Sequence, residues 1–493
     1  MQKKQLTIVI VSLLVVVLSV SLAYFTTQII GKGKDVSVTS TNLQIVFTDT
    51  DGEIAGSDIE PGWSATKTFT VQNNSKEEYM YNIVIKDLVN TFVTKGYLRY
   101  KITSTNDGYN MTDYKDIPKS SVATDTILAY SVSIPKDVTQ TYTIEFKYPN
   151  DEDVDQGDDM GKVLKGTLFI TEGTSPTLYA QLLEDKTTRP GERTDFSTVL
   201  TTDNTKTLYT GTEDGTKVYY FAGNATDNWV KFGGYYWRII RTNSDGGVRL
   251  LYHGTSTTAT DAYINSSTAF NSTYNNPMYV GYMYGTKGDL VNNRANTNNS
   301  TIKEVIDTWY ADNLNTNYGK YLSTTAVYCN DRSVTSGTYS VSSSFDYAAY
   351  TRLYTNKTPT YDCTTTEDKF TVDSSTGNGK LTYPIALMTT DEISFAGGVY
   401  GTNASTWYYY NSANGSSTGS TYWWLLSPGI WDGSVARVFD VSGSLNPGLL
   451  SYGYVGLSDG VCPVTSLKSC VKYASGDGTA SNPYTIEETS TGC

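Results

Sequence analysis

The chain has 493 residues, which is more than one ordinary domain needs and predicts two or three domains. Hydrophobic residues make up 39% and charged residues only 18%, so the chain can bury real cores and does not belong to the disordered class. The net charge of −13, with no Lys/Arg cluster longer than a pair after residue 34, excludes a nucleic-acid-binding protein.

Two residue types have unusual counts, and both limit the possible functions. The 41 tyrosines, together with abundant Thr, favour strands and predict a β-rich protein. The chain has a single histidine, His253, which excludes a two-histidine zinc site, and no Ser-His-Asp triad is expected around it. We interpret His253 as a strand-end residue. The sequence therefore predicts no enzyme, with no catalytic set, no metal site and no cofactor.

The N-terminal segment, residues 1–31, is predicted to be a transmembrane signal anchor. Residues 6–25 are uncharged and rich in Leu, Val and Ile, and as a helix they would span about 30 Å, the thickness of a bilayer core. An anchor would keep Lys3 and Lys4 in the cytoplasm. A cleaved signal would instead be cut after Ala23, which follows the small-x-small pattern. We expect a single-pass cell-membrane protein with an extracellular bulk, or a secreted one if it is cleaved.

Residues 35–173 are predicted to form an Ig-like β-sandwich. Short alternating runs separated by Pro, Gly and Asn turns are typical of this architecture. The runs are 43–47, 67–71, 81–85, 98–102, 127–132, 142–146 and 166–170. The stretches 59–62, 67–71 and 73–75 resemble bacterial surface Ig-like modules and the region after the export signal in camelysin and TasA-type matrix proteins.

An acidic run at 151–159 interrupts the predicted sandwich. Asp occupies positions 1, 3, 5 and 9 of a calcium-binding loop, but position 6 is not Gly and position 12 is Lys162 rather than Glu. We expect a solvated acidic loop between two strands. Residues 174–210 follow as a predicted solvated linker with one short helix at 178–183, punctuated by Pro176 and Pro190.

Residues 211–493 are predicted to be a second, α+β domain with a C-terminal tail. Runs at 218–221, 229–232, 235–241 and 248–252 indicate strands, and Gly233-Gly234 is a hairpin signal. Residues 302–314 place apolar side chains at i, i+3, i+4, i+7 and i+8, which indicates a helix. A second helix is predicted at 390–396, capped by Thr390 or Asp391 and ended by Gly397. The predicted fold class is therefore α+β, mostly β.

Four stretches of this domain resemble a family of exported Gram-positive surface proteins: 230–241, 381–385 with Asp391-Glu392, 422–429 (Tyr-Trp-Trp-Leu-Leu-Ser-Pro-Gly) and 460–464 before Leu467-Lys468. The resemblance, over roughly 220–470, implies a C-type-lectin-like domain in the formylglycine-generating-enzyme-like form. Related domains include the variable proteins of diversity-generating retroelements, which change their ligand contacts before the Gly-Val-x-Pro-Val segment. This chain departs from the family at Cys462, where Arg is usual, which puts a structural ion pair in doubt.

The five cysteines are expected to be structural. Cys329 and Cys363 lie in loop-like sequence of an exported chain, and a disulfide is the simplest interpretation. Cys462 and Cys470 could pair, or one of them could be a buried thiol. Cys493 is expected to be free or to pair outside the domain. No histidine or basic cluster is near to activate a thiol, so cysteine catalysis is not expected.

A ligand-binding surface is the remaining candidate site. In 430–433 and 446–459, large apolar and aromatic residues alternate with Gly and Ser, the composition of recognition loops. The alternative is that these residues are alternate core positions of a hairpin, and Trp423 and Trp424 are expected in the core. The candidate ligand-binding residues are Trp431, Asp432, Leu449, Ser451, Tyr452, Tyr454 and Asp459.

The expected function is a cell-surface binding or adhesion protein. An Ig-like stalk would present the C-type-lectin-like domain to a surface protein or glycan ligand, with the N-terminal helix in the membrane. The alternative is a structural matrix protein in which the sandwich domain forms fibres.

Overall fold

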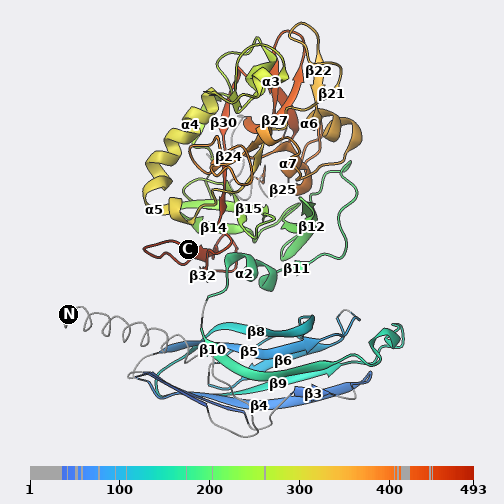
Figure 1. Ribbon diagram of the computed structural model, residues 1–493, viewed down its shortest axis with the longest axis vertical. Helices are drawn as coiled ribbons and strands as arrows, with labels where there is room; N and C mark the ends of the chain where they lie inside the picture. Colours follow the sequence, from blue (N-terminus) through green and yellow to red (C-terminus); the bar gives the residue numbers. More distant parts are fainter. Residues whose placement is uncertain are drawn as a thin grey trace, which may run out of the picture. The chain divides into compact units, whose positions relative to one another are not determined.

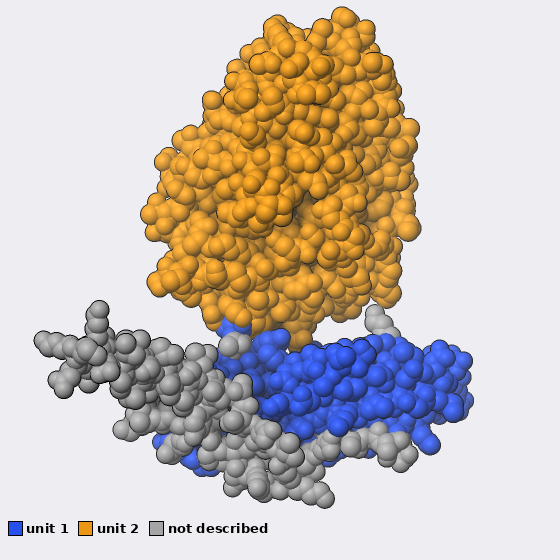
Figure 2. Space-filling view, in the orientation of Figure 1, with its two compact units in different colours: residues 1–175 blue, residues 176–493 orange. Residues whose placement is uncertain are grey.

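The structure is a computed structural model. It describes residues 36–40, 43–49, 54–56, 59–75, 78–94, 96–106, 108–173, 175–202, 204–259, 262–404, 406–407, 410–411, 422–443, 446 and 448–493. The chain divides into two compact units, Met1–Ser175 and Pro176–Cys493 (Figure 2). The predicted anchor at 1–31 lies outside the described residues, and no helix within them is long and apolar enough to cross a membrane.

The first unit consists of two antiparallel sheets (Figure 1). The six-stranded sheet has the order β1 (Val36–Ser40), β2 (Leu43–Asp49), β4 (Trp63–Asn73), β9 (Thr139–Tyr148), β6 (Arg99–Ser104) and β7 (Lys115–Asp116). The four-stranded sheet has the order β3 (Ile54–Gly56), β10 (Leu164–Glu172), β5 (Tyr79–Asn90) and β8 (Ser120–Ile134). Each of the seven predicted runs lies in one of these strands, apart from Leu98, which precedes β6.

Alternation along the strands explains the core of this unit. In β9 every second side chain, from Gln140 to Tyr148, is buried, as expected for a strand with one face on a core. Tyr142 of β9 stacks on Phe69 of β4, with ring centroids 4.9 Å apart. The acidic run lies between β9 and β10, as expected, and includes the 3-10 turn η1 (Gly157–Asp159). One of its acidic residues is buried: Asp159 accepts hydrogen bonds from the Val93 amide and the Tyr148 hydroxyl.

The second unit has two larger sheets. The eight-stranded sheet has the order β11 (Thr187–Thr188), β12 (Thr207–Glu213), β13 (Thr216–Tyr220), β15 (Tyr235–Thr242), β16 (Val248–Tyr252), β31 (Pro463–Leu467) and β24 (Ile385–Leu387), with β14 (Trp229–Phe232) on β15. The seven-stranded sheet has the order β17 (Asn265–Ala269), β30 (Ser458–Val461), β27 (Trp423–Trp431), β22 (Phe345–Tyr347) and β21 (Val334–Ser336); β28 (Ala436–Val441) pairs with β27 and with β29 (Leu450–Tyr454).

Short strand pairs and helices complete this unit. The pairs are β18 (Met283–Tyr284) with β19 (Asn298–Asn299), β20 (Tyr328–Cys329) with β23 (Lys369–Phe370), β25 (Thr406–Trp407) with β26 (Tyr410–Asn411), and β32 (Tyr473–Ser475) with β33 (Thr485–Ile486). The helices are α2 (Leu178–Asp185), α3 (Leu290–Asn293), α4 (Thr301–Tyr310), α5 (Thr316–Tyr318), α6 (Ala348–Tyr350) and α7 (Thr390–Ala396). The 3-10 turns are η2 (Pro277–Val280), η4 (Gly319–Tyr321) and η6 (Thr366–Asp368), and the π-helical segments are η3 (Ala311–Asn315) and η5 (Thr351–Asn356).

Local sequence signals explain several of these elements. The turn between β14 and β15 needs positive φ angles at Gly233 and Gly234, +64° and +81°, which glycine adopts without strain. All four strands predicted at 218–252 are present. Both predicted helices are present too, as α4 with its continuation through η3 and as α7. The cap of α7 differs from the prediction, because Thr389 and Glu392 form a reciprocal capping box.

The predicted linker, 174–210, is wrong as a solvated spacer. The second unit begins at Pro176, and Leu178 and Leu182 of α2 are both 1% exposed within its core. Lys186, just after α2, forms a buried ion pair with Asp227, with Nζ and Oδ2 2.7 Å apart. The short helix predicted there is present, but its apolar face packs on the domain that was expected to begin at residue 211.

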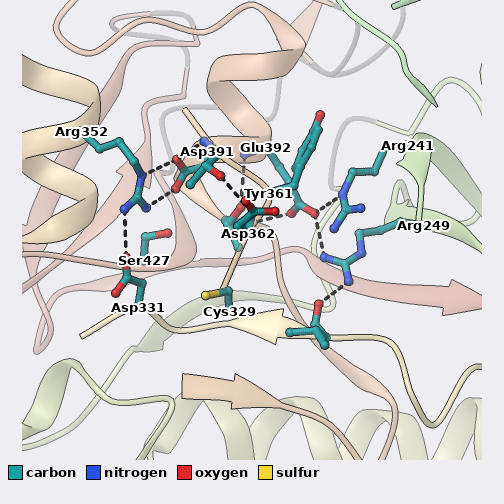
Figure 3. A pocket seen from close by; sticks show the side chains of 13 residues that line it. Arg241, Arg249, Cys329, Asp331, Arg352, Tyr361, Asp362, Asp391, Glu392 and Ser427 are labelled. Carbon is teal, nitrogen blue, oxygen red and sulfur yellow. Dashed lines mark hydrogen bonds and ion pairs between the residues drawn. The ribbon is translucent and has the colours of Figure 1, made fainter. Parts of the chain in front are cut away.

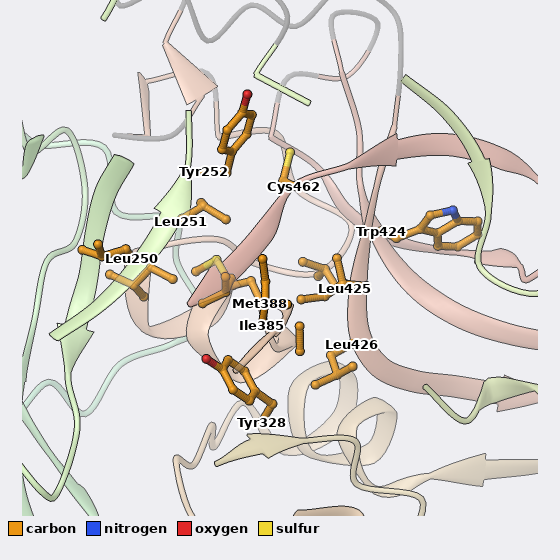
Figure 4. Close-up of a cluster of buried hydrophobic side chains, with 14 of the residues drawn as sticks. Leu250, Leu251, Tyr252, Tyr328, Ile385, Met388, Trp424, Leu425, Leu426 and Cys462 are labelled. Atoms are coloured by element: carbon orange, nitrogen blue, oxygen red, sulfur yellow. The ribbon is translucent and has the colours of Figure 1, made fainter. Parts of the chain in front are cut away.

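The cysteines are partly as predicted. Cys329 and Cys363 form a disulfide, which confirms that pairing. Cys493 pairs with Cys470, so the expectation that Cys493 is free or pairs outside the domain is wrong. Cys462 is a fully buried thiol and belongs to the apolar cluster drawn in Figure 4. Trp423 and Trp424 lie in the same core, as predicted.

Candidate functional site

Four tyrosines of the second unit form one partly exposed cluster, which we call the tyrosine patch. Tyr350 and Tyr354 stack with ring centroids 5.0 Å apart, and Tyr354 lies 5.1 Å from Tyr400. Tyr452 stacks on Tyr400 at 6.0 Å and lies edge-on to Tyr350 at 5.7 Å. Tyr354 is 50% exposed and the other three are partly buried, so the patch presents aromatic faces and edges at the surface.

Three different elements bring these tyrosines together. Tyr350 ends α6 and Tyr354 lies in the following π-helical segment η5, one helical turn later on the same face. Tyr452 lies on β29, directly across from Phe439 of β28. Tyr400 follows α7 and is fixed beside β29 by an isolated bridge to Leu450. Single π turns are frequent at functional sites, so the π-helical η5 supports the choice of this cluster as a candidate site.

Arg352 fixes η5 on the side of the segment opposite to Tyr350 and Tyr354. It lies between Tyr350 and Tyr354 in sequence, and its guanidinium binds both carboxylate oxygens of Asp391 in α7, at 2.8 and 2.7 Å (Figure 3). Its third contact is with Asp331, at 2.9 Å. A bidentate guanidinium–carboxylate pair fixes geometry as well as distance. The two tyrosines that flank Arg352 are therefore held on a rigid support.

A second charged cluster lies next to the first, because Glu392 follows Asp391 in α7. Glu392 accepts from Arg241 at 2.9 Å and from Arg249 at 2.7 Å (Figure 3). Arg241 also binds Glu213 at 2.8 Å. Burial opposes ionisation of Glu392, but Arg249 and Arg241 outweigh it and hold its pKa below the usual value. Burial likewise opposes ionisation of Glu213, and Arg241 outweighs it to give a pKa of about 2.

This charged cluster is built for structure rather than proton transfer. Each carboxylate is paired with guanidinium groups, which do not give up a proton at physiological pH. The cavity among these residues is about 20 Å³, room for roughly one water molecule. Among the described residues, no group of three or more His, Cys, Asp or Glu side chains is placed to hold a metal ion.

Two tyrosines of the patch have raised pKa values. Burial, followed by the neighbouring Tyr452, raises the pKa of Tyr350 to about 12. Burial, again followed by Tyr452, also raises the pKa of Tyr400. Lys357 places its ammonium 5.8 Å from the Tyr354 ring centroid, and burial lowers its pKa. The patch can therefore offer ring stacking, hydroxyl hydrogen bonds and one adjacent cation.

Two residues predicted to bind ligand lie on one face of the β28–β29 hairpin, and a third, Asp432, lies in the turn between β27 and β28. Tyr452 and Tyr454 share this face because strand side chains alternate. Tyr454 lies opposite Arg437, which forms an ion pair with Asp432 at 2.8 Å. Tyr454 also contacts Tyr274, with ring centroids 5.7 Å apart. Burial opposes ionisation of Asp432, but turn amides, Ser434 and Arg437 hold its pKa near 2.

The other predicted residues lie elsewhere. Leu449 is partly buried just before β29, and Ser451 points to the opposite face, where its hydroxyl binds Asp440. Trp431 is 1% exposed and Asp459 is 7% exposed, so the expectation that they reach the surface is wrong. Trp431 is buried at the end of β27, in which residues 423–429 are all buried, so this strand is buried on both faces. The alternation of aromatic residues with glycine in the sequence does not reveal such a position.

Sequence reasoning missed three of the four tyrosines of the patch. Tyr350 and Tyr354 carried a signal, since their spacing of four residues places them together on any helical segment. Tyr400 carried none, because its neighbours in the patch are distant in sequence. The composition of 446–459 identified Tyr452, but only the fold places the other three beside it.

Comparisons with known proteins do not identify a family for this chain. No protein-family profile matches the chain, and no curated protein matches it. The similarity to solved structures is weak, as two of the matches show. AvmM, which catalyzes macrocyclization in alchivemycin A biosynthesis, matches 30% of this chain over 100% of its own, with 12% identity and a TM-score of 0.16. A ruminal GH26 endo-beta-1,4-mannanase matches 37% of this chain over 30% of its own, with 15% identity and a TM-score of 0.15.

Proposed function

We propose that this protein is a cell-surface binding protein whose second unit holds a protein or glycan ligand on the tyrosine patch. In this proposal the second unit is a C-type-lectin-like domain, the first unit is an Ig-like stalk, and residues 1–31 anchor the chain in a membrane. The observation that supports it best is the patch itself, four tyrosines from three elements carried on a support of buried ion pairs.

Tyrosine suits such a role for physical reasons. Its side chain offers a large amphipathic contact area, and ordering it costs little conformational entropy. Here that cost is lower still, because the rings already pack against one another in the free protein. Arg352 and Asp391 fix the segment that carries two of them. Preorganisation of this kind raises affinity by lowering the cost of binding.

The test is a binding screen with alanine variants of the patch. The full chain in detergent micelles would be screened against arrays of cell-surface proteins and of glycans. Tyr354→Ala and Tyr452→Ala should each weaken a specific hit at least about tenfold, because central aromatic anchors carry most of the energy of an interface. Tyr130→Ala, at a tyrosine of the first unit that is 38% exposed, is the matched control. A specific hit that survives both patch substitutions excludes the patch as the binding site.

One observation favours the structural alternative. Strand β8 lies at the edge of the four-stranded sheet as far as the described residues go, and it is 15 residues long. Its first half is largely exposed, including Val122 at 68%. An unpaired edge of this length can accept another strand, which would support fibre formation. Concentration-dependent fibres from the full chain, lost on Val122→Lys, would support this function instead.

A further inference from the structure

A separate cavity of about 190 Å³ lies at two hairpin turns of the eight-stranded sheet. One turn joins β12 to β13 and includes Asp214, and the other joins β15 to β16 and includes Asn243 and Asp245. The rest of the wall comes from Thr325, Ala326, Val327, Tyr361, Cys363 and Thr376. None of the four residues of the tyrosine patch lines this cavity, so it is independent of the proposed function.

Asn243 is the unusual residue in the wall. It is 6% exposed, and within the described part of the chain neither the nitrogen nor the oxygen of its side-chain amide has a hydrogen-bond partner. Its backbone is fixed, because its N–H donates to the Gly247 carbonyl at 2.8 Å and its carbonyl accepts from Gly246 at 3.0 Å. A buried amide without partners costs stability, so its presence at a cavity wall indicates a group that pairs with it there.

The charged side chains around the cavity limit which kind of ligand group can pair with the Asn243 amide. Both oxygens of Glu213 are used, by Arg241 at 2.8 Å and by the Ser244 amide at 2.6 Å. Asp214 has a side chain that is 56% exposed, with Lys369 4.0 Å away. Asp245 is exposed and uses one oxygen to accept from the Gly247 amide at 2.8 Å. Carboxylate oxygens at the rim accept hydrogen bonds from hydroxyl groups and disfavour anions.

We propose that this cavity binds a small neutral polyol of the size of one sugar ring. A hydroxyl group both donates and accepts, as the amide of Asn243 does, so adjacent hydroxyls can satisfy both of its atoms. The remaining hydroxyls can donate to the carboxylates at the rim. The volume is that of roughly six water molecules, which suits one ring and is too small for a drug-sized ligand.

The experiment is a titration of the full chain in detergent micelles with single sugars. Methyl α-glucoside, methyl α-mannoside, methyl α-galactoside, N-acetylglucosamine and glycerol would be tested by ligand-observed NMR up to about 10 mM, a range suited to weak binding. We expect saturable binding of at least one of them. Asn243→Leu should weaken it at least about tenfold, since two hydrogen bonds are lost.

The Asn243→Leu variant should remain folded, because it replaces an unpaired buried amide with an apolar side chain of similar size. Its melting temperature checks this. Asn271→Leu is the matched control, at a second buried asparagine, 3% exposed, that does not line the cavity. The proposal is overturned if no sugar binds and the cavity holds water alone. It is also overturned if binding survives Asn243→Leu, or if inorganic phosphate displaces the sugar.

Discussion

Asp440 on β28 and Asp459 on β30 are two buried carboxylates, and Asp440 lies on the face of the β28–β29 hairpin opposite Tyr452. Asp440 is 2% exposed and accepts a hydrogen bond from Ser451. Burial raises its pKa to about 7, the Ser451 hydroxyl opposes the rise, and the nearby charge of Asp459 adds to it. Burial also raises the pKa of Asp459 to about 6. Both acids therefore prefer the protonated form in the folded state.

The raised pKa values of Asp440 and Asp459 predict that the second unit becomes less stable as the pH rises. The unfolded chain ionises both groups near pH 4, whereas the folded chain holds the protons up to about pH 6–7. Above pH 4 the unfolded state binds fewer protons, so the free energy of unfolding of the second unit should decrease until about pH 7. Asp440→Asn, which mimics the protonated acid in both states, should stabilise the second unit at both pH 5 and pH 8, and the gain should be larger at pH 8 by roughly 2–3 kcal/mol.

Chemical denaturation at the two pH values measures this difference. Asp312→Asn, at an exposed aspartate, is the control and should shift neither value. If Asp440→Asn gives the same change at both pH values, Asp440 is ionised throughout and the pH dependence assigned to it is wrong.

The α6–η5 segment shows how one element carries a surface feature. Tyr350 and Tyr354 project from the segment, and Arg352 fixes it to α7 through Asp391. A surface helix of this length has little stability of its own, so tertiary contacts decide its conformation. The sequence contains the i, i+4 tyrosine pair, but the acid that fixes the segment lies 39 residues away.

Replacing Arg352 should therefore disturb the tyrosine patch without changing any tyrosine. Arg352→Met leaves Asp391 and Asp331 without their common cation. Because the Arg352 side chain is 18% exposed, the loss should be smaller than the about 3–5 kcal/mol of a fully buried ion pair. We expect the melting temperature of the second unit to fall and ligand binding at the patch to weaken. Arg352→Lys should recover part of the stability, because the charge is kept and the bidentate geometry is lost. Equal losses in both variants would show that the charge of Arg352 contributes nothing.

For the whole molecule, the boundary at Pro176 rather than residue 211 has consequences for any isolated fragment. Leu178 and Leu182 contribute to the core of the second unit, and Lys186 neutralises the buried Asp227. Each buried Leu stabilises by about 1.5–3 kcal/mol, and an unpaired buried carboxylate costs about 3–5 kcal/mol. The sum is comparable with the total stability of a typical domain.

A fragment of residues 176–493 should thus fold cooperatively with both disulfides formed, whereas 211–493 should be unfolded or far less stable. Circular dichroism during heating, with mass spectrometry of the disulfides, distinguishes the two outcomes. The double variant Leu178→Ala/Leu182→Ala in the 176–493 fragment is the intermediate case. Its melting temperature should lie between the melting temperatures of the two unsubstituted fragments. Equal melting temperatures for 176–493 and 211–493 would contradict the assignment of α2 to this core.

What the sequence determined by itself was local. Alternation along 142–148, the glycines at 233–234 and the apolar spacing at 302–310 specify strands, a hairpin and a helix through interactions between near neighbours. The disulfide of Cys329 and Cys363 also followed from residue type. The tertiary structure alone decided that α2 packs on the second unit, that Cys493 pairs with Cys470, that Trp431 is buried, and that Tyr350, Tyr354 and Tyr400 meet Tyr452. Each of these depends on contacts between residues far apart in the chain, which no local pattern records.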